Sequence, residues 1–356
     1  MNSTSPNPPL QLEELTAVLL AQGSTAGQLI AALERYVQVC HIVGGIEPDP
    51  AFDAWAGDSF LADGVAIAPQ AAAHCARDYR RTVVFIRGVS AALEQSKQRF
   101  PGETLHIVYA GCGPYATLLL PLLARYAPTE LDVCLLDIHQ DSLDSVKKLL
   151  GHFGLERHSV ETVQGDACTY VHSRPPHLII TETMQKSLEQ EPQLAITAQL
   201  APQLRDGGIF IPGKIEVRMC LACLDRPRFG DTGSSVGAVS RRSTDQHELC
   251  KVLTLTPELA APLLQSATFR NNRAKWELQP VIVEIPSLES LGSLRAALFT
   301  CIQVFGQHRL EDYDAEITLP LRCTDMSPLV AGERWEISYQ LGGYPRFDIR
   351  RATECG

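Results

Sequence analysis

Residues 105–115, LHIVYAGCGPY, decide the fold. The first six are apolar enough for a buried strand, and Gly111 and Gly113 follow before another apolar segment begins. Glycines let the backbone turn sharply and approach a ligand closely. A dinucleotide-binding fingerprint would place a third glycine where Thr117 or Leu118 stands. The segment therefore predicts a strand–turn–helix unit, whose turn either binds a ligand or is an ordinary tight connection.

Strand and helix patterns alternate after this unit. Helix patterns cover 117–126 and 141–153, and strand patterns cover 131–138, 159–167, 177–183 and 207–212. This order is typical of a parallel sheet with crossover helices. The sequence therefore predicts an α/β Rossmann-like core over residues 101–212.

The segments on either side of this core have different patterns. Residues 1–9 are rich in Pro, Ser and Asn and predict a flexible tail. Residues 10–100 carry helical periodicity and predict an N-terminal helical cap, with two helices separated by a break at 23–25 and a third helix over 69–98. Short β-rich runs predict a mostly antiparallel, β-rich domain at 213–356; the clearest are 214–224, 280–286, 297–306, 315–321 and 335–341.

Acidic side chains end the second and third strands of the predicted core. Asp137 stands roughly 20 to 25 residues beyond the glycines, where a carboxylate can accept hydrogen bonds from both ribose hydroxyls of a nucleotide cofactor. Asp166 ends the next strand and would hold the adenine amino group or shape its pocket, unless it is a helix N-cap. The core residues predicted to contact a cofactor are Gly111, Cys112, Gly113, Tyr115, Asp137 and Asp166.

Composition argues against several classes of function. The net charge of −10 disfavours a nucleic-acid partner, because such binding depends on Lys and Arg neutralising phosphates. No apolar run reaches the ~18 residues of a membrane span, so no membrane partner is expected. The eleven cysteines are scattered and no secretory pattern starts the chain, which favours a reducing, cytoplasmic location. Cys220 and Cys223 have no second ligand pair nearby, so we expect core packing and no metal site.

Two glutamates follow the strand pattern at 177–183. Glu182 stands at the end of that strand, and Glu191 comes nine residues later, beyond a polar loop. Two carboxylates so placed could hold a guanidinium, whose planar fork of donors suits charge-assisted, bidentate hydrogen bonds. Glu189 is close enough in sequence to replace Glu191 in this role. The alternative is that these acids cap the next helix or face solvent.

These features together resemble the class I S-adenosylmethionine methyltransferases, and the glutamates sharpen the resemblance to the protein arginine methyltransferase family. The double-E loop of that family has the pattern Ser/Thr-Glu-x-Met, with a second Glu nine residues after the first. This chain has Thr181, Glu182, Thr183, Met184 and then Glu191. The resemblance implies S-adenosylmethionine as cofactor and Glu182 and Glu191 as catalytic residues. It also implies a barrel-like form for the β-rich C-terminal domain. Nicotinamide binding is the competing interpretation, but a hydride-transfer enzyme has no reason to carry this second pair of acids.

An upstream segment also resembles this family. Asp78, Arg81 and Thr82 match its helix pattern D-x-x-R-T, whose arginine pairs with the methionine carboxylate of the cofactor. Arg81 is therefore predicted to contact the cofactor; a solvated arginine on a helix face is the alternative. The family's Thr-His-Trp triplet and Tyr-Phe helix start are missing from the sequence. His308 is a candidate replacement for that histidine, and the helices at 10–43 are candidates for the missing lid.

The predicted function is methyl transfer from S-adenosylmethionine to a guanidinium nitrogen of free arginine or another small guanidino compound. Enzyme alternatives on the same fold are methylation of protein arginine, methylation of another amine, and cyclisation of the cofactor by its own amino group. From a different class, the chain could be a cofactor-binding scaffold with a vestigial site. Relatives of this type usually pair, so the resemblance also allows a homodimer.

Overall fold

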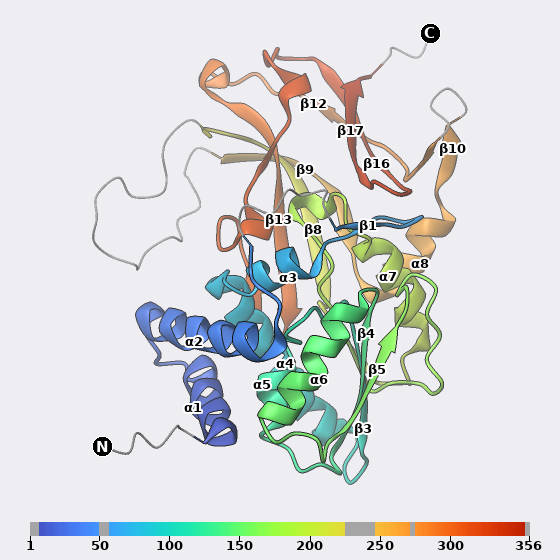
Figure 1. Ribbon diagram of the computed structural model, residues 1–356. Helices are drawn as coiled ribbons and strands as arrows, with labels where there is room; N and C mark the ends of the chain where they lie inside the picture. The colour runs from blue at the N-terminus through green and yellow to red at the C-terminus, as the bar shows by residue number, and fades with distance from the viewer. Residues whose placement is uncertain (1–6, 50–56, 225–245, 271–274, 353–356) are drawn as a thin grey trace.

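A computed structural model of the protein describes residues 7–49, 57–224, 246–270 and 275–352. At its centre lies a five-stranded sheet in which every neighbouring pair of strands is parallel (Figure 1). Its strands are β3 (Leu105–Ala110), β4 (Leu131–Asp137), β5 (Ser159–Gln164), β6 (Leu178–Thr181) and β7 (Ile209–Ile211), in the spatial order β5-β4-β3-β6-β7. The predicted Rossmann-like α/β core is confirmed.

The order of the strands creates a binding crevice at one edge of the sheet. From β3 the chain adds β4 and β5 on one side and then returns to add β6 and β7 on the other. In such sheets ligands bind outside the carboxyl ends of the strands where the order reverses, here between β3 and β6. Both strands are apolar and almost wholly buried, as expected for parallel strands covered on both faces. The glycine turn after β3 and the glutamate after β6 therefore meet at this edge.

Some helices pack directly on this sheet, and others pack on those helices. Helix α4 (Tyr79–Arg99) contacts β6 and β7, and α6 (Gln140–His152) contacts β4 and β5. Helices α1 (Pro8–Leu20) and α2 (Ala26–Gly44) pack against α4 and α6 (Figure 1). The predicted break between the first two helices is confirmed, since Thr25 forms a capping box at the start of α2. Within the described ranges, no helix has the length and apolar character to cross a bilayer.

Two predicted helices differ from the structure. The helix expected over 69–98 is divided into α3 (Pro69–Cys75) and α4, because the Asp78 side chain accepts a hydrogen bond from the Arg81 N–H at 3.2 Å and caps a new helix. The helix expected over 117–126 is reduced to α5 (Leu120–Leu123). It starts late because Ala116 has a left-handed φ of 42°, which an α-helix cannot include.

Two antiparallel sheets follow the core. The first contains β8 (Lys214–Ala222), β9 (Gln246–Leu255), β13 (Arg295–Phe305), β14 (His308–Leu310) and β15 (Leu321–Arg322). The second contains β10 (Thr268–Arg270), β11 (Lys275–Glu277), β12 (Val281–Glu284), β16 (Arg334–Gln340) and β17 (Arg346–Arg351), and α8 (Pro257–Gln265) joins β9 to β10. One apolar cluster runs from α1 through the core into both sheets.

The C-terminal part is β-rich as predicted, but its barrel form is not found. Among the described residues, no ladder of hydrogen bonds joins the two sheets into a closed barrel. The strand expected over 315–321 is instead mainly a 3₁₀ turn, Glu316–Thr318. The Thr318 hydroxyl explains this turn, since it accepts from the Ala315 N–H at 3.0 Å and donates to the Ala315 carbonyl at 3.1 Å.

Candidate active site

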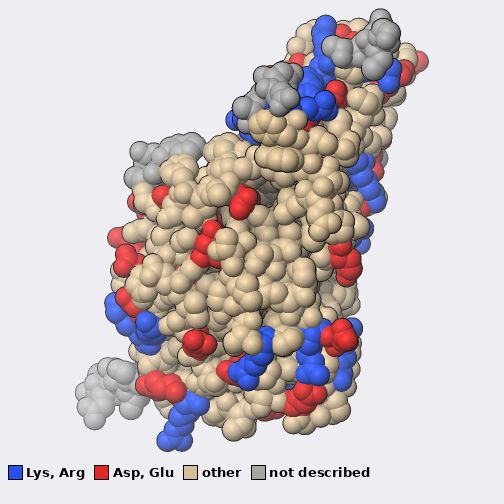
Figure 2. Space-filling view, turned by 90° about the vertical axis from the view of Figure 1, so that its right-hand side faces the viewer, with Lys and Arg blue, Asp and Glu red and all other residues tan. Residues whose placement is uncertain are grey.

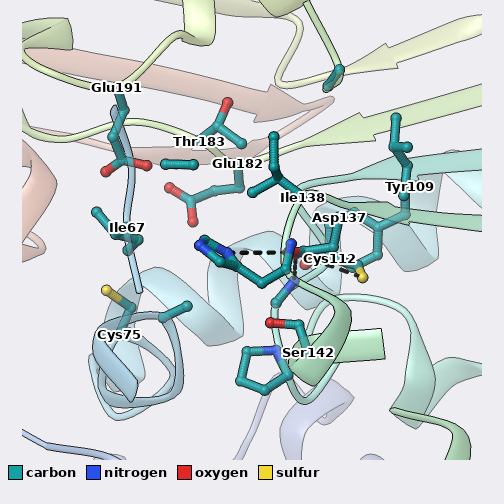
Figure 3. Close-up of a pocket in the computed structure, with 18 of the residues that line it drawn as sticks. Ile67, Cys75, Tyr109, Cys112, Asp137, Ile138, Ser142, Glu182, Thr183 and Glu191 are labelled. Carbon is teal, nitrogen blue, oxygen red and sulfur yellow. Dashed lines mark hydrogen bonds and ion pairs between the residues drawn. The ribbon is translucent and has the colours of Figure 1, made fainter. Parts of the chain in front are cut away.

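A cavity opens at the carboxyl edge of the parallel sheet (Figure 3). Its empty space measures about 1050 Å³, including the mouth that is open to solvent. Every residue predicted to contact cofactor or substrate lines it: Arg81, Gly111, Cys112, Gly113, Tyr115, Asp137, Asp166, Glu182 and Glu191. The fold therefore brings the predicted cofactor residues and the two predicted catalytic glutamates to one place.

The turn after β3 has a backbone shape that favours glycine. Gly111 and Gly113 have φ angles of 67° and 64°, in the left-handed region. A Cβ on Gly111 would lie 2.4 Å from Cγ2 of Thr183, the residue after Glu182. Gly113 donates its N–H to Oδ2 of Asp137 at 2.9 Å. The glycines thus form the turn, leave room for the glutamate segment, and link the turn to the acid of β4.

Gly111→Ala is expected to lower the free energy of unfolding by about 2 kcal/mol, because it adds both a left-handed alanine and a clash with Thr183. Gly102→Ala is the matched control, since Gly102 has a φ of 78° but nothing within 4 Å of its added Cβ. Urea unfolding of both variants measures the difference. Equal losses of stability would contradict the crowding at Thr183.

Asp137 and Asp166 line the cavity from the ends of neighbouring strands. Asp137 is 7% exposed; its Oδ1 accepts from the His139 N–H at 2.9 Å, and its Oδ2 accepts from Gly113. Oδ2 also accepts a long, weak hydrogen bond from the Cys112 thiol at 4.0 Å, and Nδ1 of His139 lies 3.5 Å from Oδ1. A diol would bind Asp137 by replacing these two weak contacts. Asp166 accepts from the Cys168 N–H at 2.8 Å, and a turn follows it, so the helix-cap alternative is wrong.

The polar groups of the Tyr115 and Cys112 side chains are less available to a cofactor than the sequence predicted. The Tyr115 hydroxyl donates to the Ile46 carbonyl at 2.5 Å, and the Tyr115 carbonyl accepts from the Tyr36 hydroxyl at 2.9 Å. Tyr115 therefore joins the turn to α2 and presents its ring and backbone to the cavity. Cys112 is buried beside Asp137, and burial raises the pKa of its thiol well above the ordinary value.

A short hairpin and α3 cover the cavity, in place of the helices at 10–43 that we expected as a lid. The roof hairpin, residues 59–66, consists of β1 (Ser59–Phe60) and β2 (Val65–Ala66). It contributes Leu61 and Ala66 to the lining, whereas no described residue of α1 or α2 lines the cavity. The lid prediction is thus wrong, because α1 and α2 pack on the sides of α4 and α6, from where the Tyr36 hydroxyl reaches the Tyr115 carbonyl.

The roof hairpin is fastened at two points. The Val65 N–H donates to the Gln190 carbonyl at 2.7 Å, next to Glu191. Ser59 Oγ lies 3.1 Å from Nε2 of His139, whose N–H binds Asp137. The hairpin therefore spans the cavity from the predicted ribose acid to the predicted substrate acid.

Charge on the face of the molecule is unevenly distributed. Figure 2 shows Lys and Arg side chains at the top, on the C-terminal sheets, and mixed with Asp and Glu at the bottom, whereas the middle of the face is mostly uncharged and carries a few acidic side chains. Inside the cavity, the described lining contains four carboxylates, Asp137, Asp166, Glu182 and Glu191, against one arginine, Arg81. This balance suits cationic ligands.

The two glutamates lie together deep in the cavity, on the loop between β6 and α7 (Gln193–Leu200) (Figure 3). Glu182 pairs through Oε2 with Nη2 of Arg81, and the two side chains are each 10% exposed. Its Oε1 is buried and has no hydrogen-bond partner among the described residues. Burial raises the pKa of Glu182, although the charge of Arg81 opposes the shift.

Glu191 is 7% exposed, and no described residue donates a hydrogen bond to its carboxyl group. Burial, followed by the neighbouring charge of Glu182, raises its pKa to about 8. Buried carboxyl oxygens without donors, such as Oε1 of Glu182, are rare in folded proteins, and a bound ligand is one explanation for them. The pair therefore forms a buried acceptor site for a cation.

Glu191→Gln is expected to raise the melting temperature of the ligand-free protein by about 5 °C at pH 8.5 and to leave it nearly unchanged near pH 4.5. The native carboxyl group keeps its proton up to about pH 8, whereas the unfolded one loses it near 4.5. Between these values the native state binds more protons, so the wild type loses stability as pH rises, and the amide does not. Thermal melts across this range test the prediction, which parallel curves for the two proteins would contradict.

The segment that carries Glu191 has an unusual backbone. Ser187, Leu188 and Gln190 all have left-handed φ angles, of 57°, 56° and 68°. The C-terminal sheets hold this shape: Thr300 Oγ1 accepts from the Ser187 N–H at 3.0 Å, and the Tyr339 hydroxyl donates to the Leu188 carbonyl. The Pro345 carbonyl also accepts from the Gln190 N–H at 2.7 Å. The position of Glu191 therefore depends on strands far along the chain.

Two candidate replacements do not reach the site. Glu189 is absent from the described lining of the cavity, so Glu191 alone joins Glu182 there. His308 lies on β14 against α4, where a Cβ on Gly88 would be 3.6 Å from that of His308. His308 is likewise absent from the described lining and does not stand in for the missing histidine.

Sequence reasoning missed several residues of the site. His139 follows Asp137 by two positions and lines the cavity. Its place just after the end of a strand could have marked it as a site residue. The roof hairpin lies in a Gly- and Asp-rich stretch with no strand pattern, so nothing in the sequence pointed to it. Gln193, which bonds to Thr181 and Thr183 on either side of Glu182, also belongs to no recognisable motif.

Comparisons with known proteins give a distant structural likeness. No protein-family model and no curated protein matches the chain. Among solved structures, the chain is similar to the Trypanosoma brucei PRMT1 enzyme-prozyme heterotetrameric complex with AdoHcy, with 12% identity and a TM-score of 0.46, over 78% of this chain and 96% of that chain. At this low identity and TM-score the likeness carries no argument about function.

Proposed function

We propose that the protein transfers the methyl group of S-adenosylmethionine to a guanidinium nitrogen of a small acceptor. The observation that supports this most is the pair of buried carboxyl groups, Glu182 and Glu191, in the cavity that the glycine turn and Asp137 also line. A cationic, multi-donor group satisfies both carboxylates at once, and a guanidinium has the matching planar geometry.

The residues present fit an adenosylmethionine cofactor. The glycine turn lets a ligand approach the backbone after β3, and a ribose diol could replace the weak contacts of Asp137 with the Cys112 thiol and the His139 ring. Arg81 has five N–H donors, so it can bind a carboxylate of the cofactor in addition to Glu182. When bound, the cofactor supplies an electrophilic methyl group on a positively charged sulfur.

The glutamates would orient the acceptor and accept its proton. Oε1 of Glu182 and the carboxyl group of Glu191 each have acceptor positions that no described residue fills, which allows hydrogen bonds to two edges of one guanidinium. Holding its far nitrogens localises positive charge there and leaves the third nitrogen more nucleophilic. Methyl transfer also releases one proton, and a carboxylate beside the reacting nitrogen can take it. Positioning would supply much of the rate.

The roof hairpin favours a small acceptor over a protein tail. It crosses the cavity from His139 to Gln190 and packs against the loop near Gly343, where a Cβ would lie 3.0 Å from the Leu61 carbonyl. A free amino acid or similar guanidine needs only a narrow entrance, whereas a peptide needs an open groove beside the glutamates.

The test is to incubate the protein with S-adenosylmethionine carrying a labelled methyl group and to offer free arginine, an arginine-rich peptide and simple amines. Product mass and S-adenosylhomocysteine are followed together. We expect a guanidine to gain one methyl mass and free arginine to exceed the peptide. Methylation of amines alone, release of methylthioadenosine, or cofactor binding without any transfer would each overturn the guanidinium proposal.

A further inference from the structure

A buried amide ties together the two ends of the glutamate loop, which we define as residues 182–192. Gln193, the first residue of α7, is fully buried. Its Oε1 accepts from the N–H and the hydroxyl of Thr183, both at 3.0 Å. Its Nε2 donates to the hydroxyls of Thr181 at 2.6 Å and Thr197 at 3.2 Å. All four hydrogen-bonding positions of the amide are filled.

The orientation of this amide follows from its partners. The backbone N–H of Thr183 can only donate, so the amide oxygen must face it and the amide nitrogen must face Thr181 and Thr197. The hydroxyl of Thr197 is free to accept because it donates its own hydrogen to the Gln193 carbonyl at 2.7 Å. The network thus has one consistent arrangement of donors and acceptors.

The place of the network relates it to the glutamates. Thr181 and Thr183 are the residues immediately before and after Glu182, and Gln193 stands two positions after Glu191. The amide therefore joins the two residues that flank Glu182 to the start of α7, two positions after Glu191. Between these anchors the loop includes three left-handed residues, a shape that local backbone preferences do not maintain.

We propose that Gln193 is the positioning residue of the carboxylate pair: its side chain fixes the separation and direction of Glu182 and Glu191 without touching the acceptor. This proposal rests on the proposed function for its meaning in catalysis. Displacement of a reacting group by about 1 Å can lower a rate by about 100-fold, so loss of these hydrogen bonds has a large effect on turnover. Cofactor binding depends mainly on the glycine turn and Asp137, so we expect it to change much less than turnover.

Gln193→Met removes all four hydrogen bonds at similar volume, and Gln199→Met is the matched control. Gln199 lies on the same helix and donates to the Tyr170 carbonyl at 2.9 Å, outside the glutamate loop. We expect Gln193→Met to lower kcat for guanidine methylation by about 100-fold while the Kd for S-adenosylhomocysteine changes less than about twofold. We expect Gln199→Met to leave both values near those of the wild type.

A second readout needs no substrate. Carbon-13 labelling of glutamate carboxyl groups allows the titration of Glu191 to be followed by NMR in each variant. We expect its pKa to fall in Gln193→Met, because separated carboxyl groups repel each other less and admit water, and to stay unchanged in Gln199→Met. An unchanged titration together with unchanged kcat overturns the positioning role. If the wild type methylates no guanidine, the proposed function fails, and the NMR titration alone still decides whether Gln193 positions the pair.

Discussion

Glu182→Gln is expected to lower kcat for guanidine methylation by about 10³-fold while cofactor affinity stays within a few-fold of the wild type. The amide keeps the shape of the side chain but loses the charge that pairs with Arg81 and that would hold the acceptor. A glutamine amide has one acceptor oxygen where the carboxylate has two, so it cannot accept from Arg81 and from a guanidinium through separate oxygens. Single-turnover kinetics with labelled S-adenosylmethionine measure the loss, and calorimetry with S-adenosylhomocysteine measures the affinity.

Glu189→Gln is the control for this experiment. Glu189 belongs to the same loop but does not line the described cavity, so its amide variant is expected to keep near-normal turnover. A Glu182→Gln protein that still methylates a guanidine at the wild-type rate would show that the carboxylate pair is not the acceptor site.

Asp137→Ala is expected to raise the Kd for S-adenosylhomocysteine by about 100-fold. Two hydrogen bonds from ribose hydroxyls to a carboxylate contribute about 1.5 kcal/mol each, which together correspond to this factor. The substitution also removes the acceptor for the Gly113 and His139 N–H groups, so the glycine turn loses a support. Calorimetric titration of the purified variant is the measurement.

Asp132→Ala provides a matched comparison on the same strand. Asp132 lies at the opposite end of β4, where it accepts from Ser159 at 2.7 Å and pairs with Arg174, away from the cavity. We expect its loss to leave cofactor affinity unchanged. If both variants bind equally well, the cofactor does not sit at Asp137, and the assignment of the glycine turn fails with it.

The sequence predicted those parts of the site in which the local backbone conformation or the end of a strand determines the residue type. Gly111 and Gly113 stand where the backbone must be left-handed, and Asp137 ends a strand whose apolar pattern is unmistakable. The parallel sheet follows from the same alternation of apolar strands and helices. Local patterns of this kind survive folding because neighbouring residues determine them.

The parts that the sequence did not predict depend on contacts between distant segments. The roof hairpin has no strand pattern and takes its place by bonding to Gln190 and His139. Gln193 gains its role only because α7 starts beside the end of β6. The barrel was expected from the family resemblance; strand patterns predict β-structure, but closure depends on which strand edges meet, and periodicity carries no information on that point.

The left-handed loop beside Glu191 has a consequence for how such a protein can change over time. Thr300 and Tyr339 fix that loop from β13 and β16, which belong to other sheets than the one that carries the turn after β3 and Asp137. Substitutions in those remote strands can therefore alter which acceptor fits while the nucleotide half of the cavity remains as it is. The ancestry of the cofactor site and the ancestry of the acceptor preference are separable in this architecture, and the second can diverge while the first is conserved.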